Sequence, residues 1–187
     1  MDSPMSRATE SVVALARTVT PEQFDRSTPC PEWTVKDLIN HLTLWSGVVA
    51  VRTANRLPAP GDGSEDEAVD RSATWPDGFI DGARAAARAW DAPGGLDGET
   101  AMMGDPRPAR FFHDMLLAEL VLHGWDLATA TGHEFTVDDD VAELARASTA
   151  AMAEQGREWG VFGAEVAVPE DAPVLHRALA ISGRDPR

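Results

Sequence analysis

The most constraining feature of the sequence is residues 115–127, a segment that is apolar almost all the way round a helix. Helices of this kind are buried inside a protein. The segment nevertheless carries Glu119 and His123 four positions apart, so both side chains lie on one helix face, one turn from each other. Phe112 and Leu116 belong to the same face, which therefore points inward. The sequence predicts a buried helix that directs a carboxylate and an imidazole at the core.

A carboxylate in a protein core costs free energy unless a partner compensates its charge. A divalent metal ion is one such partner, and a Glu/His pair on one helix face is a common half of a metal site in a helical bundle. A hydrogen bond between Glu119 and His123, or a protonated Glu119, explains the same pair without a metal. These two residues alone leave all three explanations open.

Length and charge limit the classes of protein to which the chain can belong. A chain of 187 residues fits a single domain, residues 1–187, with a sizeable core. A net charge of −15 argues against sequence-independent nucleic-acid binding and against anionic membrane surfaces. No apolar run is long enough to span a bilayer and no leader pattern opens the chain, so we expect a cytoplasmic protein. The single cysteine, Cys30, excludes an internal disulfide.

Apolar residues recur at helical spacing along most of the chain. A Thr-x-x-Asp capping pattern at Thr34 and again at Thr136 predicts two of the helix starts. Because helices dominate and no parallel-sheet pattern is visible, we predict an all-α fold, a four-helix bundle with a short irregular or extended C-terminal segment. The predicted helices comprise residues 4–20, 35–49, 76–93, 109–131, 137–156 and 172–181.

Two segments are predicted to lie outside the bundle. Residues 57–72 are rich in Pro, Gly and acidic residues, which is typical of a mobile surface loop. Residues 157–187 form a C-terminal extension that follows the last bundle helix.

A second helix supplies another candidate ligand, His41, among Leu38, Leu42 and Trp45. A lone histidine on an apolar face is more often a packing residue than a ligand. In a four-helix bundle, however, this face and the face of Glu119 can converge on one point. Two neutral nitrogens and one carboxylate leave coordination positions open, as in catalytic sites, and suit Zn²⁺ but also Ni²⁺, Fe²⁺ or Mn²⁺.

Two further residues, Asp126 and Cys30, are weaker candidates for a role in the site. Asp126 shares a helix face with His123 and is a candidate for a hydrogen bond to a ligand histidine, although a bond to a helix end explains it equally well. We interpret Cys30 as a packed thiol rather than a nucleophile or a fourth ligand, because it precedes its helix and has no base nearby in the sequence. The remaining histidines are expected to point elsewhere or to lie on the surface: His113, His133 and His176.

Three sequence motifs resemble those of a known group of proteins. Residues 28–38, Thr-Pro-Cys-Pro-Glu-Trp-Thr-Val-Lys-Asp-Leu, followed by His41-Leu42, resemble the N-terminal motif of the mycothiol-dependent maleylpyruvate isomerase group of the DinB/YfiT-like metalloenzyme superfamily. Residues 119–128 are similar to its second motif, E-x3-H-x-W-D-L-A. The closing Gly-Arg-Asp-Pro resembles the end of a short-chain subfamily. The resemblance spans nearly the whole chain, and the paired motifs are specific.

The resemblance implies a four-helix bundle with one metal ion, usually zinc, whose ligands match His41, Glu119 and His123. Members use a low-molecular-weight thiol, mycothiol in actinobacteria, for isomerisation or thiol transfer. The full isomerase has a longer C-terminal domain, so for this chain we expect transfer of sulfur to an electrophilic small molecule rather than isomerisation. The alternatives are a non-catalytic bundle that binds a metal or a small ligand, and a helical interaction protein with an empty site. Partners are expected to be the thiol and the electrophile, with no nucleic acid and no membrane; a homodimer is left open.

Overall fold

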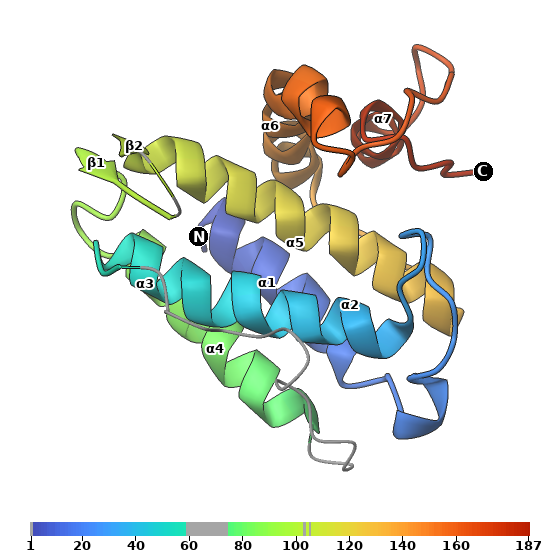
Figure 1. The fold of residues 1–187 in the computed structure, drawn as a ribbon, viewed down its shortest axis with the longest axis horizontal. Coiled ribbons are helices and arrows are strands. Elements are labelled where there is room, and N and C mark those ends of the chain that lie inside the picture. The colour runs from blue at the N-terminus through green and yellow to red at the C-terminus, as the bar shows by residue number, and fades with distance from the viewer. Residues whose placement is uncertain (1, 59–74, 103, 105) are drawn as a thin grey trace.

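The computed structural model describes residues 2–58, 75–102, 104 and 106–187, and the fold is mostly helical (Figure 1). The described strands form one small antiparallel hairpin, in which β1 (Glu99–Thr100) pairs with β2 (Arg107–Pro108). The prediction of an all-α fold is therefore confirmed. The helical segments are α1 (Pro4–Ala16), η1 (Pro21–Gln23), α2 (Val35–Leu42), η2 (Thr43–Val49), α3 (Ala50–Ala54), α4 (Trp75–Asp91), α5 (Ala109–Thr131), α6 (Asp139–Glu158) and α7 (Val174–Ile181).

The bundle consists of α1, α4, α5 and the continuous helix formed by α2, η2 and α3, which run alongside one another (Figure 1). The start of α1 follows its sequence, because the Ser3 side chain accepts a hydrogen bond from the Ser6 amide and Pro4 occupies the first turn. The start of α2 is the predicted capping box, in which Thr34 and Asp37 each bond to the other's backbone amide. These local signals fix where two bundle helices begin.

Helix α5 is the centre of the fold and is buried on nearly every side, as its apolar sequence predicts. It contacts α1 and α2 within the bundle, and α6 covers it from outside (Figure 1). Leu117 and Val121 are fully buried in this core. Gly132, with a φ of 78°, ends α5 in the left-handed conformation that glycine adopts without cost.

The helix that carries His41 changes geometry directly after it. Residues Thr43–Val49 form η2, a π-helical stretch, before α geometry resumes in α3. Gly47 of this stretch lies against Gly82 of α4, where a Cβ on Gly82 would stand 3.3 Å from the Gly47 Cα. π-Helical turns inside α-helices are often found at functional sites.

The C-terminal extension contains the closing helix predicted at residues 172–181. Residues Val174–Ile181 form α7, which packs against α6 beside the bundle (Figure 1). The irregular segment before α7 bonds to its end, through Gly163 N to Ser182 O at 3.0 Å and Val166 N to Ala180 O at 3.0 Å. The extension is thus a helix with an irregular connection, and no strand occurs in its described residues, 157–187.

Predicted boundaries of three helices are wrong. The helix predicted at residues 35–49 continues through α3 to Ala54. Helix α1 ends at Ala16 rather than near residue 20, because Pro21 holds Thr20 in an extended conformation and the chain must leave the helix before it. Asp138 occupies the N-cap position of α6 without a side-chain capping bond, and the expected Thr136–Asp139 capping box does not form. Asp138 instead pairs with Arg7 at 2.6 Å, which ties the start of α6 to α1.

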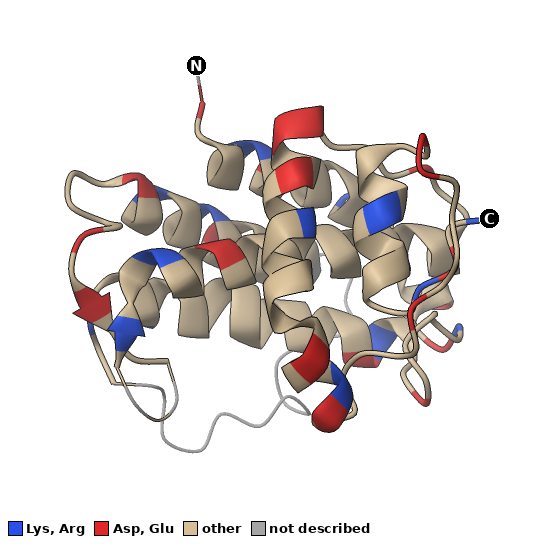
Figure 2. Cartoon of the chain, turned by 90° about the horizontal axis from the view of Figure 1, so that it is seen from above, with Lys and Arg blue, Asp and Glu red and all other residues tan. Residues whose placement is uncertain are grey.

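The surface carries its acidic residues on many elements. Asp and Glu residues are interspersed with Lys and Arg over several helices and loops (Figure 2). Of the loop predicted at residues 57–72, all but Leu57 and Pro58 lie outside the described residues. Among the helices that the structure describes, none has the length and apolarity needed to cross a membrane.

Candidate metal centre

Three side chains from two helices meet at one point between α2 and α5. His41 Nε2 lies 2.5 Å from Glu119 Oε1, and His123 Nε2 lies 3.2 Å from the same oxygen. One ligand atom from each residue lies within 4.8 Å of the other two. The structure therefore brings together the three residues that the sequence singled out.

This donor set fits a divalent metal ion. Two imidazole nitrogens and a carboxylate oxygen are the ligands that zinc takes in sites with an open coordination position. Ligand atoms about 2.0–2.1 Å from a tetrahedral ion stand about 3.3 Å apart, which is close to the separation between His123 and Glu119. The Glu119 side chain is 30% exposed, whereas those of His41 and His123 are 13% and 11% exposed. The Glu119 side chain is therefore partly exposed, while both histidines are more deeply buried.

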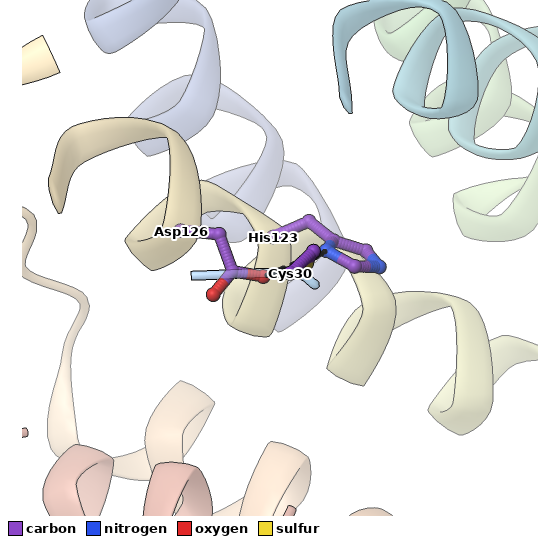
Figure 3. A group of neighbouring side chains, drawn as sticks. All are labelled: Cys30, His123 and Asp126. Carbon is purple, nitrogen blue, oxygen red and sulfur yellow. Dashed lines mark hydrogen bonds and ion pairs between the residues drawn. The ribbon is translucent and has the colours of Figure 1, made fainter. Parts of the chain in front are cut away.

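The orientation of His123 is fixed by Asp126, one turn further along α5. His123 Nδ1 lies 2.8 Å from Asp126 Oδ2. Because an ionised carboxylate only accepts hydrogen bonds, Nδ1 carries the proton and Nε2 is directed at Glu119. Figure 3 shows this arrangement, with one ring nitrogen toward Cys30 and Asp126 and the other pointing away from them. Asp126 thus makes the hydrogen bond to His123 that was one of its two predicted roles.

Asp126 is fully buried and is paired with an arginine from the far end of the chain. Arg184 donates from Nε to Oδ1 at 2.8 Å and from Nη2 to Oδ2 at 2.7 Å. Burial raises the pKa of Asp126, but the hydrogen bond from His123 and the charge of Arg184 outweigh it and lower the pKa to about 2. Asp126 is therefore a carboxylate whose charge is balanced inside the protein.

The negative charge of Glu119 and the positive charge of His123 stabilise each other. Burial raises the pKa of Glu119, but the charge of His123 and hydrogen bonds from His123 and His41 hold it well below its ordinary value. Burial lowers the pKa of His123, yet Glu119, Asp126 and Cys30 together raise it well above 6.5. A metal ion at this point must displace the proton on Nε2, so metal binding is coupled to proton release.

A second group of potential ligands, Cys30, His123 and Asp126, lies on the other side of the imidazole (Figure 3). Cys30 Sγ lies 3.2 Å from Asp126 Oδ2 and 3.7 Å from His123 Nδ1. A cation here would stand beside the guanidinium of Arg184, whose Nη2 is 3.5 Å from the same nitrogen. That repulsion, and the two bonds from Arg184 that already occupy Asp126, favour the group of His41, Glu119 and His123 as the candidate metal site.

The segment before α2 places Cys30 and Trp33 at this centre. The Thr28 side chain donates to Trp33 O at 3.0 Å and accepts from Cys30 N at 3.2 Å, which closes a tight turn. Glu32 adopts a φ of 66° inside this turn, an uncommon conformation for a residue other than glycine. The turn brings the Trp33 ring to 4.8 Å from the His41 ring and 5.9 Å from the His123 ring, between centroids.

Comparison with known proteins gives the chain a family. Residues 5–128 match the family described as "Mycothiol maleylpyruvate isomerase N-terminal domain". The chain belongs to this family. Membership places it in the DinB/YfiT-like superfamily, and the helical structure agrees with a DinB-like fold. The matched part contains His41, Glu119, His123 and Asp126 but ends well before Arg184.

Relatives of this family member include uncharacterized proteins from two strains of Mycobacterium tuberculosis, CDC 1551 / Oshkosh and ATCC 25618 / H37Rv. Each is 29% identical to the chain, and the alignment covers 97% of this chain and 96% of the relative. No solved structure matches the chain at a significant level.

Three other histidines of this family member lie away from the centre. His113 is buried, with its ring 5.8 Å from that of Trp90 and its Nδ1 2.7 Å from Asp114. His133 is exposed just after α5, as predicted, and His176 lies partly exposed on α7.

The sequence-based interpretation of Cys30 needs correction. The thiol is not simply packed away from polar groups, because His123, Asp126 and Arg184 all lie within 3.9 Å of its sulfur. These groups are distant in sequence, so no local pattern reveals them. Trp33 and Arg184 were not predicted to take part in the site. Their signal lay in the motifs that contain them, Pro-Glu-Trp and the closing Gly-Arg-Asp-Pro.

Proposed function

We propose that this chain is a metal-dependent enzyme that uses a small thiol, mycothiol being the first candidate, to transfer sulfur to an electrophilic small molecule. The proposed ligands of the metal, with zinc as the first candidate, are His41, Glu119 and His123. The observation that carries the proposal is the convergence of their ligand atoms within 4.8 Å of one another. Family membership supports the choice of a thiol as cosubstrate.

A divalent metal at this centre would supply Lewis acidity, which favours the deprotonated form of a thiol and polarises a carbonyl group. The residues of the chain prepare the centre for that role. Asp126 keeps the His123 proton on Nδ1 and so leaves Nε2 available as a ligand. Glu119 contributes one negative charge, which offsets part of the charge of a divalent cation. Trp33 lies roughly parallel to the His123 ring, at an interplanar angle of 25°, and limits how that ring can turn.

The attacking sulfur in this proposal belongs to the cosubstrate and not to Cys30. The Cys30 thiol lies on the Nδ1 side of His123 and donates to Asp126, away from the other ring nitrogen, Nε2, which is the proposed ligand atom (Figure 3). A nucleophile needs a base that can accept its proton. Here the neighbouring His123 nitrogen already carries a proton, and the pKa of Asp126 is about 2, so neither group is a good base.

The test combines metal analysis with a transfer assay. Purified wild type, His123→Ala and a control, His133→Ala, are analysed for bound metal and then assayed with mycothiol and a panel of electrophilic acceptors. His133 is a suitable control because it is an exposed histidine outside the centre. Wild type and His133→Ala should carry metal and show turnover that requires the thiol, whereas His123→Ala should show neither.

Isomerisation of maleylpyruvate is assayed alongside as the second reaction. Isomerisation without transfer would replace the proposed reaction while keeping the metal and the thiol. A fully metal-loaded wild type with no thiol-dependent turnover in either assay would favour a non-catalytic binding protein.

A further inference from the structure

We propose that Arg184, outside the matched family domain, is a positioning residue for the metal site: it holds Asp126, which in turn holds the proposed ligand His123. The inference rests on the metal site of the proposed function. It adds that the C-terminal segment sets how tightly that site binds its metal.

The contact between Arg184 and Asp126 has the geometry of a rigid support. Two nearly equal bonds, at 2.8 and 2.7 Å, join the guanidinium to the two carboxylate oxygens. Such paired bonds fix the plane of a carboxylate, which a single bond does not. The Asp126 side chain is completely buried and that of Arg184 is 10% exposed, so little water is present to replace the guanidinium.

The fixed carboxylate then determines the direction of the imidazole. Asp126 Oδ2 accepts from both Arg184 Nη2, at 2.7 Å, and His123 Nδ1, at 2.8 Å. Without the guanidinium, only the bonds to His123 and Cys30 hold Asp126, so the plane of its carboxylate is less firmly fixed and the preference of His123 for an Nδ1 proton weakens. Nε2 would then point at Glu119 for a smaller fraction of the time.

The end of α7 is built to deliver Arg184 to this position. Gly183 has a φ of 90°, and a Cβ there would stand 2.6 Å from the Gly163 Cα, so glycine is needed for both conformation and space. The chain reverses at Gly183, where the Arg184 amide donates to Leu179 O at 3.0 Å. Arg184 Nη1 also donates to Ser182 Oγ at 2.9 Å, which holds the side chain along its path.

Attachment of the C-terminal segment does not depend on Arg184 alone. Arg157 of α6 donates from Nη2 to Ile181 O at 3.0 Å, and Gly163 N donates to Ser182 O at 3.0 Å. Arg157 therefore binds the same C-terminal segment but makes no hydrogen bond to Asp126. Arg157 is therefore a matched control, because it attaches the C-terminal segment to α6 but does not orient His123.

The experiment measures Zn²⁺ affinity by competition with a chromophoric chelator in full-length wild type, Arg184→Met, Arg184→Lys and Arg157→Met. Loss of a partner that orients a metal ligand typically weakens metal binding by 10- to 100-fold. We expect a loss of about that size in Arg184→Met and a smaller one in Arg184→Lys, which keeps the charge but not the paired bonds. Arg157→Met should bind Zn²⁺ as wild type does.

Nitrogen NMR of the zinc-loaded proteins gives a second readout. His123 should appear as a single form with its proton on Nδ1 in wild type and in Arg157→Met, and lose that uniformity in Arg184→Met. If Arg184→Met does not fold, Arg184→Lys carries the same comparison.

Three results would count against the proposals, and they are distinguishable. Unchanged Zn²⁺ affinity in both Arg184 variants overturns the inference alone. An equal loss in Arg157→Met shows that attachment of the segment matters and not the orientation of His123, and it also overturns the inference. Failure of wild type to bind Zn²⁺ overturns the metal site itself, and the inference with it.

Discussion

Removing the guanidinium of Arg184 should destabilise the metal-free protein, and the loss should depend on pH. Arg184→Met keeps most of the side-chain volume but leaves the carboxylate of Asp126, which is 0% exposed, without its cation. Breaking a buried ion pair by removing one partner costs roughly 3–5 kcal/mol, because the other charge stays buried. Asp126 still accepts from His123 and Cys30, so we expect the lower end of that range.

A second estimate comes from the pKa of Asp126, which falls from 3.8 to about 2 on folding. Because one pKa unit corresponds to about 1.4 kcal/mol, the surroundings of Asp126 stabilise its charged form by about 2 kcal/mol. The hydrogen bond from His123 supplies part of this stabilisation. The estimate also leaves out the cost of keeping the Asp126 charge buried without a cation. The two estimates together predict a loss of about 2–4 kcal/mol at neutral pH.

The sign of the pH dependence follows from the direction of the shift. In wild type the folded pKa of Asp126 lies below its unfolded value, so its stabilisation is complete above about pH 5 and fades as the pH falls toward 2. In Arg184→Met, burial without the guanidinium raises the folded pKa, and the carboxyl group is protonated sooner as the pH falls. The difference between variant and wild type should therefore shrink from pH 7 to pH 3.5.

Urea denaturation of metal-free wild type and Arg184→Met at pH 7 and pH 3.5 measures this difference. A double-mutant cycle with Asp126→Asn isolates the coupling between the two side chains. A loss below about 1 kcal/mol at pH 7 would contradict the magnitude inferred for a buried pair. An equal loss at both pH values would show that the ionisation of Asp126 is not responsible.

Three further predictions concern the metal, the thiol and the C-terminal turn. Chelation should lower the melting temperature, and Zn²⁺ at 100 times its Kd should restore about 2.7 kcal/mol of stability; an unchanged melting curve after verified removal argues against a stabilising metal. Cys30→Ala should keep most thiol-dependent activity in steady-state kinetics, whereas a lost kcat would identify Cys30 as the nucleophile. Gly183→Ala should lower the free energy of unfolding, measured in urea, by about 1–3 kcal/mol. The loss should exceed that of Gly98→Ala, because Gly98 has a φ of 65° but a Cβ there would meet nothing within 4 Å. Equal losses in the two variants would show that the crowding against Gly163 does not affect stability.

The sequence was sufficient to predict the parts of the site that lie on regular helices. Glu119 and His123 share a face because they are four residues apart, and the apolar residues around them indicate which face points inward. His41 could be added because its helix carries a similar apolar face. The idea that Glu119 is fully buried was too strong, since 30% of its side chain is exposed. Periodicity gives the direction of a side chain but not how far the neighbouring helix covers it.

The contacts made by Arg184 and Cys30 could not be predicted in the same way. Arg184 reaches Asp126 across 58 residues, and Cys30 reaches it across 96. Neither contact follows a helical repeat, because each depends on how a turn directs the chain after or before a helix. The start of α6 was misplaced for a related reason, since Arg7 from another helix engages Asp138 and Asp140 there. Sequence patterns therefore failed to predict the structure at the positions where contacts between distant segments determine it.

The π-helical stretch η2 changes how many residues separate His41 from the far end of its helix. A π-helical residue turns the chain by less than the roughly 100° of an α-helical residue, so η2 holds about one residue more than α geometry needs to give α3 the same orientation. Ala50 and Ala54, which are 2% and 3% exposed, face the core in this arrangement. Deleting one residue from 43–49 would let the stretch return to α geometry and leave the orientation of α3 relative to His41 almost unchanged. A homologue that is one residue shorter here can therefore keep both the direction of the histidine and the packing at the far end of the bundle.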